Sequence, residues 1–170
     1  MNFASPLFLF AFLPLMLTAY HLLRPMRAKN ALLITAGVGF FAFCGLPLLA
    51  ASCALHYAVG LALIRWQRGR GLTLAVCAAV DLAVLAMYKW RGTLPLGISF
   101  YTFQAISYVA DVYRAPQSGT RSFRQVLQYL TFFPLLVSGP LTRFSDMQPL
   151  LDARRATWDN AFAGCRRFVC

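Results

Sequence analysis

Acidic residues are scarce in this sequence, which has 5 Asp and Glu residues against 16 Lys and Arg. Charged residues make up only 12% of the chain and hydrophobic residues 59%, so an ordinary soluble domain is excluded. The formal net charge of +11 could suggest nucleic-acid binding, but the basic residues stand in short clusters between hydrophobic runs. We therefore expect no nucleic-acid partner and predict an all-α, polytopic transmembrane bundle in contact with membrane lipid.

Histidine is also scarce, and the cysteines lack any paired spacing. The chain has two histidines, His21 and His56, and neither has a Cys, Asp or Glu nearby in the sequence that would indicate a metal site. The five cysteines show no ligand-pair spacing, so we expect them to be small buried side chains. The sequence therefore predicts neither a metal site nor a cofactor.

Hydrophobic runs predict four scaffold transmembrane helices within residues 1–91. A signal peptide is the competing interpretation of the first run, but no small-residue cleavage site follows it. Gly45 and Pro47 predict a tight turn between the second and third runs, and Gly37 and Gly39 predict a close helix approach in the second. The four runs cover residues 6–23, 30–46, 48–64 and 72–88.

Three clusters of basic residues predict the topology of these runs. The positive-inside rule places all three clusters in the cytoplasm and the N-terminus outside, in a bacterial inner membrane. Lys89 and Arg91 would then lie outside, as a minor exception to the rule. The clusters are Arg24, Arg27 and Lys29; Arg65, Arg68 and Arg70; and Arg114, Arg121 and Arg124.

Polar side chains and helix breakers interrupt the apolar sequence at residues 95–143, the signature stretch. In its first half, polar residues at offsets of three, seven and ten share one narrow helical face. In its second half, Pro134 and Gly139 are expected to break the helix. Broken helices at membrane depth are tolerated where they are buried in protein or line a cavity. We therefore predict a cavity-lining wall, whose candidate residues are Gln104, Ser107, Asp111, Arg114, Gln128 and Arg143.

Two ionisable residues, His56 and Asp81, lie inside apolar runs, where such groups are costly. His56 could serve a cavity or be packed as a neutral histidine. Asp81 could be functional, or could be held by a hydrogen bond or by water. Asp111 and Arg114 could likewise form an ordinary helix-surface ion pair instead of part of a wall.

Beyond Arg143 the sequence changes character. Residues 144–170 mix apolar positions with aspartates and arginines, which predicts an interfacial amphipathic segment. The sequence shows no internal repeat and no low-complexity linker. We therefore expect the whole chain, residues 1–170, to form a single membrane domain.

Two strings in the signature stretch resemble a known family. PLGISFYTFQAISYVADVYR, at 95–114, and YLTFFPLLVSGPLTRF, at 129–144, resemble the signature region of the membrane-bound O-acyltransferases. The nearest branch is that of the bacterial alginate O-acetyltransferases and the D-alanyl transfer proteins. Three upstream strings also resemble that branch, so the resemblance covers nearly the whole chain; they are FLFAFLPLMLTAYHLLRP, FAFCGLPLLAAS and MYKW.

The resemblance implies an enzyme that passes an acyl group, often acetyl, from a cytoplasmic thioester donor or acyl carrier toward a hydroxyl of an extracytoplasmic polysaccharide such as alginate. It also implies a separate extracytoplasmic acetyltransferase as a partner. It gives Asp111, Arg114 and Arg143 structural or cavity-lining roles, and it has asparagine where this chain has His56. The family's catalytic histidine, a general base, lies downstream of the signature. The chain is therefore expected to be an N-terminal portion with no catalytic residue of its own, inactive alone.

A non-catalytic membrane scaffold or a small transporter-like helical module is the alternative. His56 and Asp81 would then be pathway residues. A transporter is expected to carry paired broken helices in two related halves, whereas this sequence has one such region.

Overall fold

The computed structural model describes residues 8–42, 45–66, 69–92, 98–132 and 142–152, and every regular element among them is a helix. The predicted all-α architecture is confirmed over these residues. The predicted breaks at Pro134 and Gly139, and most of the segment 144–170, lie outside them. The elements are a π-helix η1 (Phe8–Phe12), α1 (Leu13–Leu22), α2 (Met26–Ala42), α3 (Leu46–Arg65), α4 (Arg70–Trp90), α5 (Ile98–Arg114), a 3₁₀-helix η2 (Pro116–Ser118), α6 (Phe123–Leu130) and α8 (Phe144–Asp152).

Two of these helices are long and apolar enough to cross a membrane. They are α3, of 20 residues, and α4, of 21 residues, and a span needs about 20 apolar residues. Much of α4 faces outward, with Leu72 70% exposed and Val76 54% exposed. Such a large apolar surface suits contact with lipid. The length and composition of these two helices are those of a membrane protein's spans.

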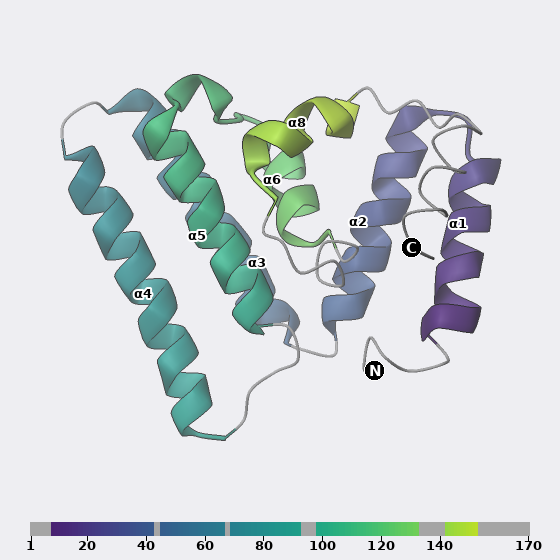
Figure 1. The fold of residues 1–170 in the computed structure, drawn as a ribbon, viewed down its shortest axis with the longest axis horizontal. Coiled ribbons are helices and arrows are strands. Elements are labelled where there is room, and N and C mark those ends of the chain that lie inside the picture. Colours follow the sequence, from purple (N-terminus) through teal and green to yellow (C-terminus); the bar gives the residue numbers. More distant parts are fainter. Residues whose placement is uncertain (1–7, 43–44, 67–68, 93–97, 133–141, 153–170) are drawn as a thin grey trace, which may run out of the picture.

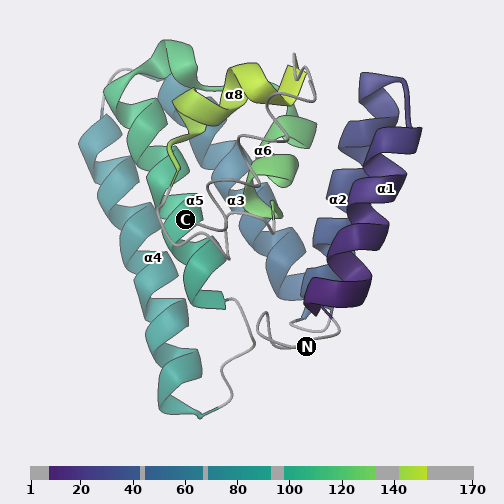
Figure 2. The same cartoon turned by 45° about the vertical axis from the view of Figure 1, so that its right-hand side comes forward.

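The helices form two groups joined by short elements (Figure 1). On one side, α3, α4 and α5 pack against one another; on the other, α1 lies beside α2. Between the groups, α6 contacts both α2 and α3, and α8 packs on α5 and α6. Turning the molecule shows that α8 lies across one end of the bundle (Figure 2). The helix α5, which carries the first half of the signature stretch, is therefore at the centre of the packing.

Three aromatic side chains form the junction of α5, α6 and α8. Tyr108, Tyr129 and Phe144, one from each helix, are fully buried. The ring of Phe144 stands edge-on to Tyr108 at 5.0 Å and to Tyr129 at 5.2 Å between centroids. Edge-to-face pairs at this distance contribute about 0.5–1.5 kcal/mol beyond the area they bury. We call these three residues the aromatic junction.

Glycines allow two of the helix contacts. A Cβ atom at Gly37 of α2 would overlap the backbone carbonyl of Thr131 at the end of α6. A Cβ at Gly60 of α3 would lie 2.6 Å from the hydroxyl oxygen of Tyr108 on α5. The predicted close approach at Gly37 is therefore confirmed, whereas a Cβ at Gly39 would meet nothing within 4 Å among the residues that the structure describes, so no close approach is found there. Gly39 lies two positions from Gly37 and so points away from α6.

Most of the helix ends that carry basic residues lie at one end of the bundle, whereas the end of α4, with Lys89 and Arg91, lies at the other. The end of α1, the start of α2, the end of α3, the start of α4 and the end of α5 are all toward the top in both views (Figures 1 and 2). Arg70, at the start of α4, donates hydrogen bonds to the carbonyls of Val112, at 3.1 Å, and Tyr113, at 2.6 Å. These carbonyls belong to the last turn of α5, where a positive side chain is favoured by the helix dipole.

Candidate functional site

The four residues of the polar stripe predicted on α5 differ in burial from one end to the other. Gln104 and Asp111 are buried. Ser107, between them, is half-buried, and Arg114 is exposed. The buried part of the stripe therefore faces other helices, as expected for polar groups on a helix that is otherwise apolar.

Gln104 and Asp111 hold the ends of two other helices. Gln104 donates from Nε2 to the carbonyl of Tyr129 at 2.8 Å, in the last turn of α6. Asp111 accepts the backbone N–H of Phe144 at 2.9 Å, at the first residue of α8. Backbone groups at helix ends lack intrahelical partners, and a carboxylate is favoured at a helix N-terminus. The helix α5 thereby holds the last turn of α6 and the first residue of α8, which come before and after residues 133–141 in the sequence.

Gln128 lies in a second buried polar chain. Its Nε2 donates to Oδ1 of Asn30 on α2 at 3.1 Å, and Nδ2 of Asn30 donates to the carbonyl of Leu151 on α8 at 2.9 Å. Both side chains are almost fully buried. The hydrogen bonds join three helices from distant parts of the sequence. Asn30 was not singled out from the sequence, where it follows a basic cluster and resembles a helix-end residue.

The two arginines of the predicted wall lie apart from these buried chains. Arg114, at the end of α5, and Arg143, just before α8, are both exposed. The carboxylate of Asp111 accepts a backbone N–H, while Arg114, three residues on, faces outward. The structure therefore brings Gln104, Asp111 and Gln128 into the α5–α6–α8 packing and leaves the arginines at the surface.

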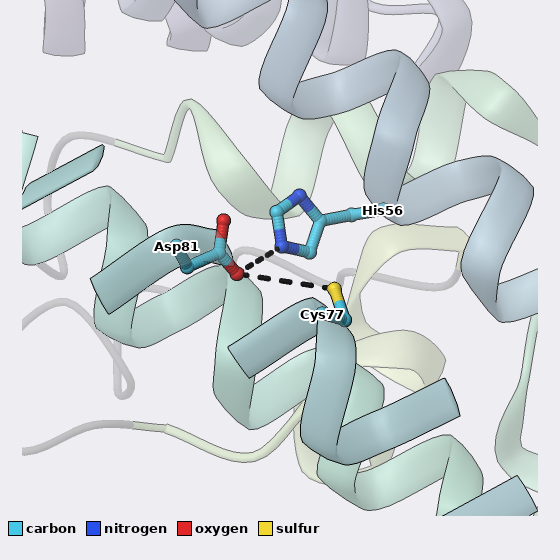
Figure 3. Close-up of side chains that lie close together, drawn as sticks. All are labelled: His56, Cys77 and Asp81. Atoms are coloured by element: carbon cyan, nitrogen blue, oxygen red, sulfur yellow. Dashed lines mark hydrogen bonds and ion pairs between the residues drawn. The ribbon is translucent and has the colours of Figure 1, made fainter. Parts of the chain in front are cut away.

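His56 and Asp81, which the sequence left separate, meet in the structure. Nε2 of His56, on α3, lies 2.8 Å from Oδ2 of Asp81, on α4. The same carboxylate oxygen lies 3.9 Å from Sγ of Cys77 (Figure 3). All three side chains are buried. We call these residues the His56 cluster.

The cluster follows from how α3 and α4 are joined. Cys77 and Asp81 are four positions apart and so share one face of α4. His56 lies nine residues before the end of α3, and Asp81 lies eleven residues after the start of α4. At a rise of about 1.5 Å per residue these are similar depths. The hairpin thus supplies the acidic partner that His56 lacks among its sequence neighbours, and a comparison of depths could have found the pair.

The hydrogen bonds around His56 limit the charge of the pair. Nδ1 of His56 lies 2.7 Å from the carbonyl of Ser52. A carbonyl only accepts, so Nδ1 carries a proton and donates. The contact between Nε2 and Asp81 then holds one further proton, on either atom. In both forms, imidazolium with carboxylate or neutral imidazole with neutral acid, the pair has no net charge, which makes its burial tolerable.

A cavity of about 130 Å³ lies beside the cluster. Asp81 and Ser52 line it, together with Thr102 of α5 and apolar side chains of α3 and α4. This volume exceeds what one water molecule needs. Asp81 therefore both contacts His56 and borders a space large enough for a small ligand.

Comparison with known proteins gives relatives over nearly the whole chain. The probable alginate O-acetylase AlgI of Azotobacter vinelandii is 37% identical over 99% of the chain, and that of Pseudomonas aeruginosa 34% identical over 99%. A peptidoglycan O-acetyltransferase of Helicobacter pylori is 30% identical over 86% of the chain. The chain spans about 40% of the length of these relatives. No protein-family model and no solved structure matches the chain.

Proposed function

Because the chain is a relative of the alginate O-acetylases, within the membrane-bound O-acyltransferase family, we propose that it contributes to the O-acetylation of an extracytoplasmic polysaccharide such as alginate. The observation that carries this proposal is 37% identity to an alginate O-acetylase over 99% of the chain. The reaction would transfer acetyl from a cytoplasmic thioester donor or acyl carrier to a hydroxyl group. A separate extracytoplasmic acetyltransferase would be its partner.

In this proposal the chain crosses the bacterial inner membrane several times, with its N-terminus outside. Two helices of spanning length support the membrane location. The common end shared by the basic connections supports the proposed topology (Figure 1), because the positive-inside rule puts such connections on the cytoplasmic side. The amphipathic helix α8 lies across this same end, in keeping with a place near the cytoplasmic interface.

The role proposed for the signature stretch is to hold neighbouring helices in place around the path that the acetyl group takes. Gln104 and Asp111 hold the backbone of Tyr129 and Phe144. These contacts lie on either side of residues 133–141, the part of the stretch with the predicted helix breaks. A wall built in this way needs its polar groups for geometry, so Gln104 and Asp111 act as positioning residues and not as groups that touch the acetyl transferred.

Deletion of the gene tests the proposal. The acetyl content of the exported polysaccharide is expected to fall to background in the deletion strain and to return when the wild-type gene is supplied. The peptidoglycan of the same strain is measured in parallel, because one relative is a peptidoglycan O-acetyltransferase. Loss of acetyl from peptidoglycan alone would move the acceptor to that polymer. Unchanged acetylation of both polymers would contradict the proposal and leave a non-catalytic membrane module.

A further inference from the structure

The His56 cluster combines the three side-chain types that bind zinc. It offers an imidazole nitrogen, a thiol sulfur and a carboxylate oxygen, and these ligand atoms all lie within 4.8 Å of one another. Zinc sites in proteins use these three ligand types, and sites with three protein ligands leave a fourth position open. We propose that His56, Cys77 and Asp81 form a binding site for a divalent transition-metal ion, of which Zn²⁺ fits the donor set best.

The distances suit a tetrahedral ion. Zinc bonds of about 2.0–2.3 Å place neighbouring ligand atoms roughly 3.3–3.6 Å apart. In the structure Nε2 of His56 is 2.8 Å from Oδ2 of Asp81, and Sγ of Cys77 is 3.9 Å from that oxygen. Shifts of about 1 Å, within the reach of side-chain rotation, would open a place for the ion between the three atoms (Figure 3).

The second ring nitrogen of His56 has the contact that metal-binding histidines usually have. Nδ1 donates to the carbonyl of Ser52 at 2.7 Å, which orients the ring and presents Nε2 toward Asp81 and Cys77. A histidine that binds zinc commonly donates its other N–H to a carbonyl or carboxylate. Because the acceptor is a backbone atom in the same helix turn, this orientation is built into α3.

Charge balance also favours a divalent ion. Without an ion, the thiol of Cys77 holds one proton and the contact between His56 and Asp81 holds another, so the cluster is neutral. A bound Zn²⁺ would displace these two protons and leave a thiolate, a carboxylate and a neutral imidazole. The sum of charges is again zero, so an ion adds no net charge to a low-dielectric interior.

The cavity leaves room for the fourth ligand of the proposed metal ion. Asp81 borders it directly, and Ser52 and Thr102 add polar groups to its wall. A water molecule or another small oxygen ligand in this space could complete four-coordination. Access from the cavity also provides the entry path that a buried metal site requires.

Metal analysis of the protein, expressed from its own gene and purified in detergent, tests the proposal. The protein is incubated with Zn²⁺, freed of loose ion, and its zinc content is measured. It is then loaded with Co²⁺, whose bond to a thiolate gives a charge-transfer absorption. Cys77→Ala removes one ligand, and Cys53→Ala is the matched control, because Cys53 is also a buried cysteine but lies on α3, outside the cluster.

About one zinc ion per chain is expected for the wild type and for Cys53→Ala. Cys77→Ala is expected to lower zinc affinity at least about tenfold, since loss of even an outer-shell partner costs roughly 10–100-fold, and to abolish the cobalt–thiolate absorption. Asp81→Asn, which keeps the size of the side chain, is expected to weaken binding as well. No retained zinc in the wild type, or equal affinity and absorption in Cys77→Ala, would overturn the proposal.

Discussion

The aromatic junction and the His56 cluster both lie among buried polar groups, but these groups have different partners. Around the junction, Gln104 and Asp111 bind backbone atoms of other helices. In the cluster, His56 and Asp81 bind each other beside a cavity. Polar groups whose hydrogen bonds go to backbone atoms hold the helices in place, whereas a side-chain pair beside a cavity can exchange its mutual hydrogen bond for a bound ligand.

Removing the acidic member of the His56 cluster is predicted to cause the greatest loss of stability. Asp81→Leu leaves Nε2 of His56 without its partner in an apolar interior, and removing one member of a buried pair costs about 3–5 kcal/mol. Reversible unfolding of the protein in mixed micelles measures the loss. Leu82→Val, at the exposed neighbouring position of α4, serves as the control and is expected to change stability by less than about 0.5 kcal/mol. Equal effects of the two variants would refute the buried pair.

The second largest loss of stability is predicted beside the aromatic junction, where Asp111 holds the start of α8. Asp111→Ala leaves the N–H of Phe144 unpaired at the start of α8, and a hydrogen bond to a charged group contributes about 1.5–3 kcal/mol. Arg114→Ala is the matched control on the same helix, and its exposed side chain predicts little change. The same unfolding assay compares the two. A larger loss for Arg114→Ala would show that the exposed end of the stripe, and not the buried end, holds the helices.

Substitutions at Gly37 and Gly39 compare a packed face of α2 with an open face of the same helix. Gly37→Ala puts a methyl group against the Thr131 carbonyl, and overpacking costs about 1–3 kcal/mol. Gly39→Ala meets none of the described residues within 4 Å and is expected to stabilise the helix by about 0.5–1 kcal/mol. Thermal unfolding midpoints in detergent should therefore move in opposite directions. Shifts of the same sign would mean that α2 does not approach α6 as described.

The smallest loss of stability is predicted at Arg70, which links the helix of the His56 cluster to α5. Arg70 begins the helix that carries Asp81, and it binds the last turn of α5. Arg70→Met is expected to cost about 0.3–1 kcal/mol, and less at high salt because charge interactions with a helix end are screened. Arg65→Met, at an exposed position at the end of α3, is the control. A loss for Arg70→Met that is unchanged by salt would point to packing as the cause.

The sequence predicted more of the fold than of the contacts. Hydrophobic runs located α1 to α4, and Gly45 and Pro47 marked the start of α3, which begins at Leu46. The spacing of Gln104 and Asp111 predicted their common face, since the pattern repeats within one helix. Periodicity could not say what that face touches, because Tyr129 and Phe144 lie on other helices.

The His56 cluster shows the same limit more clearly. Both ionisable residues stood out, because each interrupts an apolar run. Their pairing depends on the number of residues between each of them and the helix end at the α3–α4 connection. That number can be given only if the helix ends are known to within one turn. Cys77 carried no signal of its own, since a buried cysteine is the ordinary expectation.

The contrast between the two regions depends on the pairing of His56 with Asp81, which a double-mutant cycle measures directly. The stabilities of His56→Leu, Asp81→Leu and the double variant are compared with that of the wild type. Each single change leaves a polar group unpaired, whereas the double change removes both, and replacing a buried pair by apolar residues is often neutral. The double variant is therefore predicted to be more stable than either single variant. Losses that simply add would contradict the pairing.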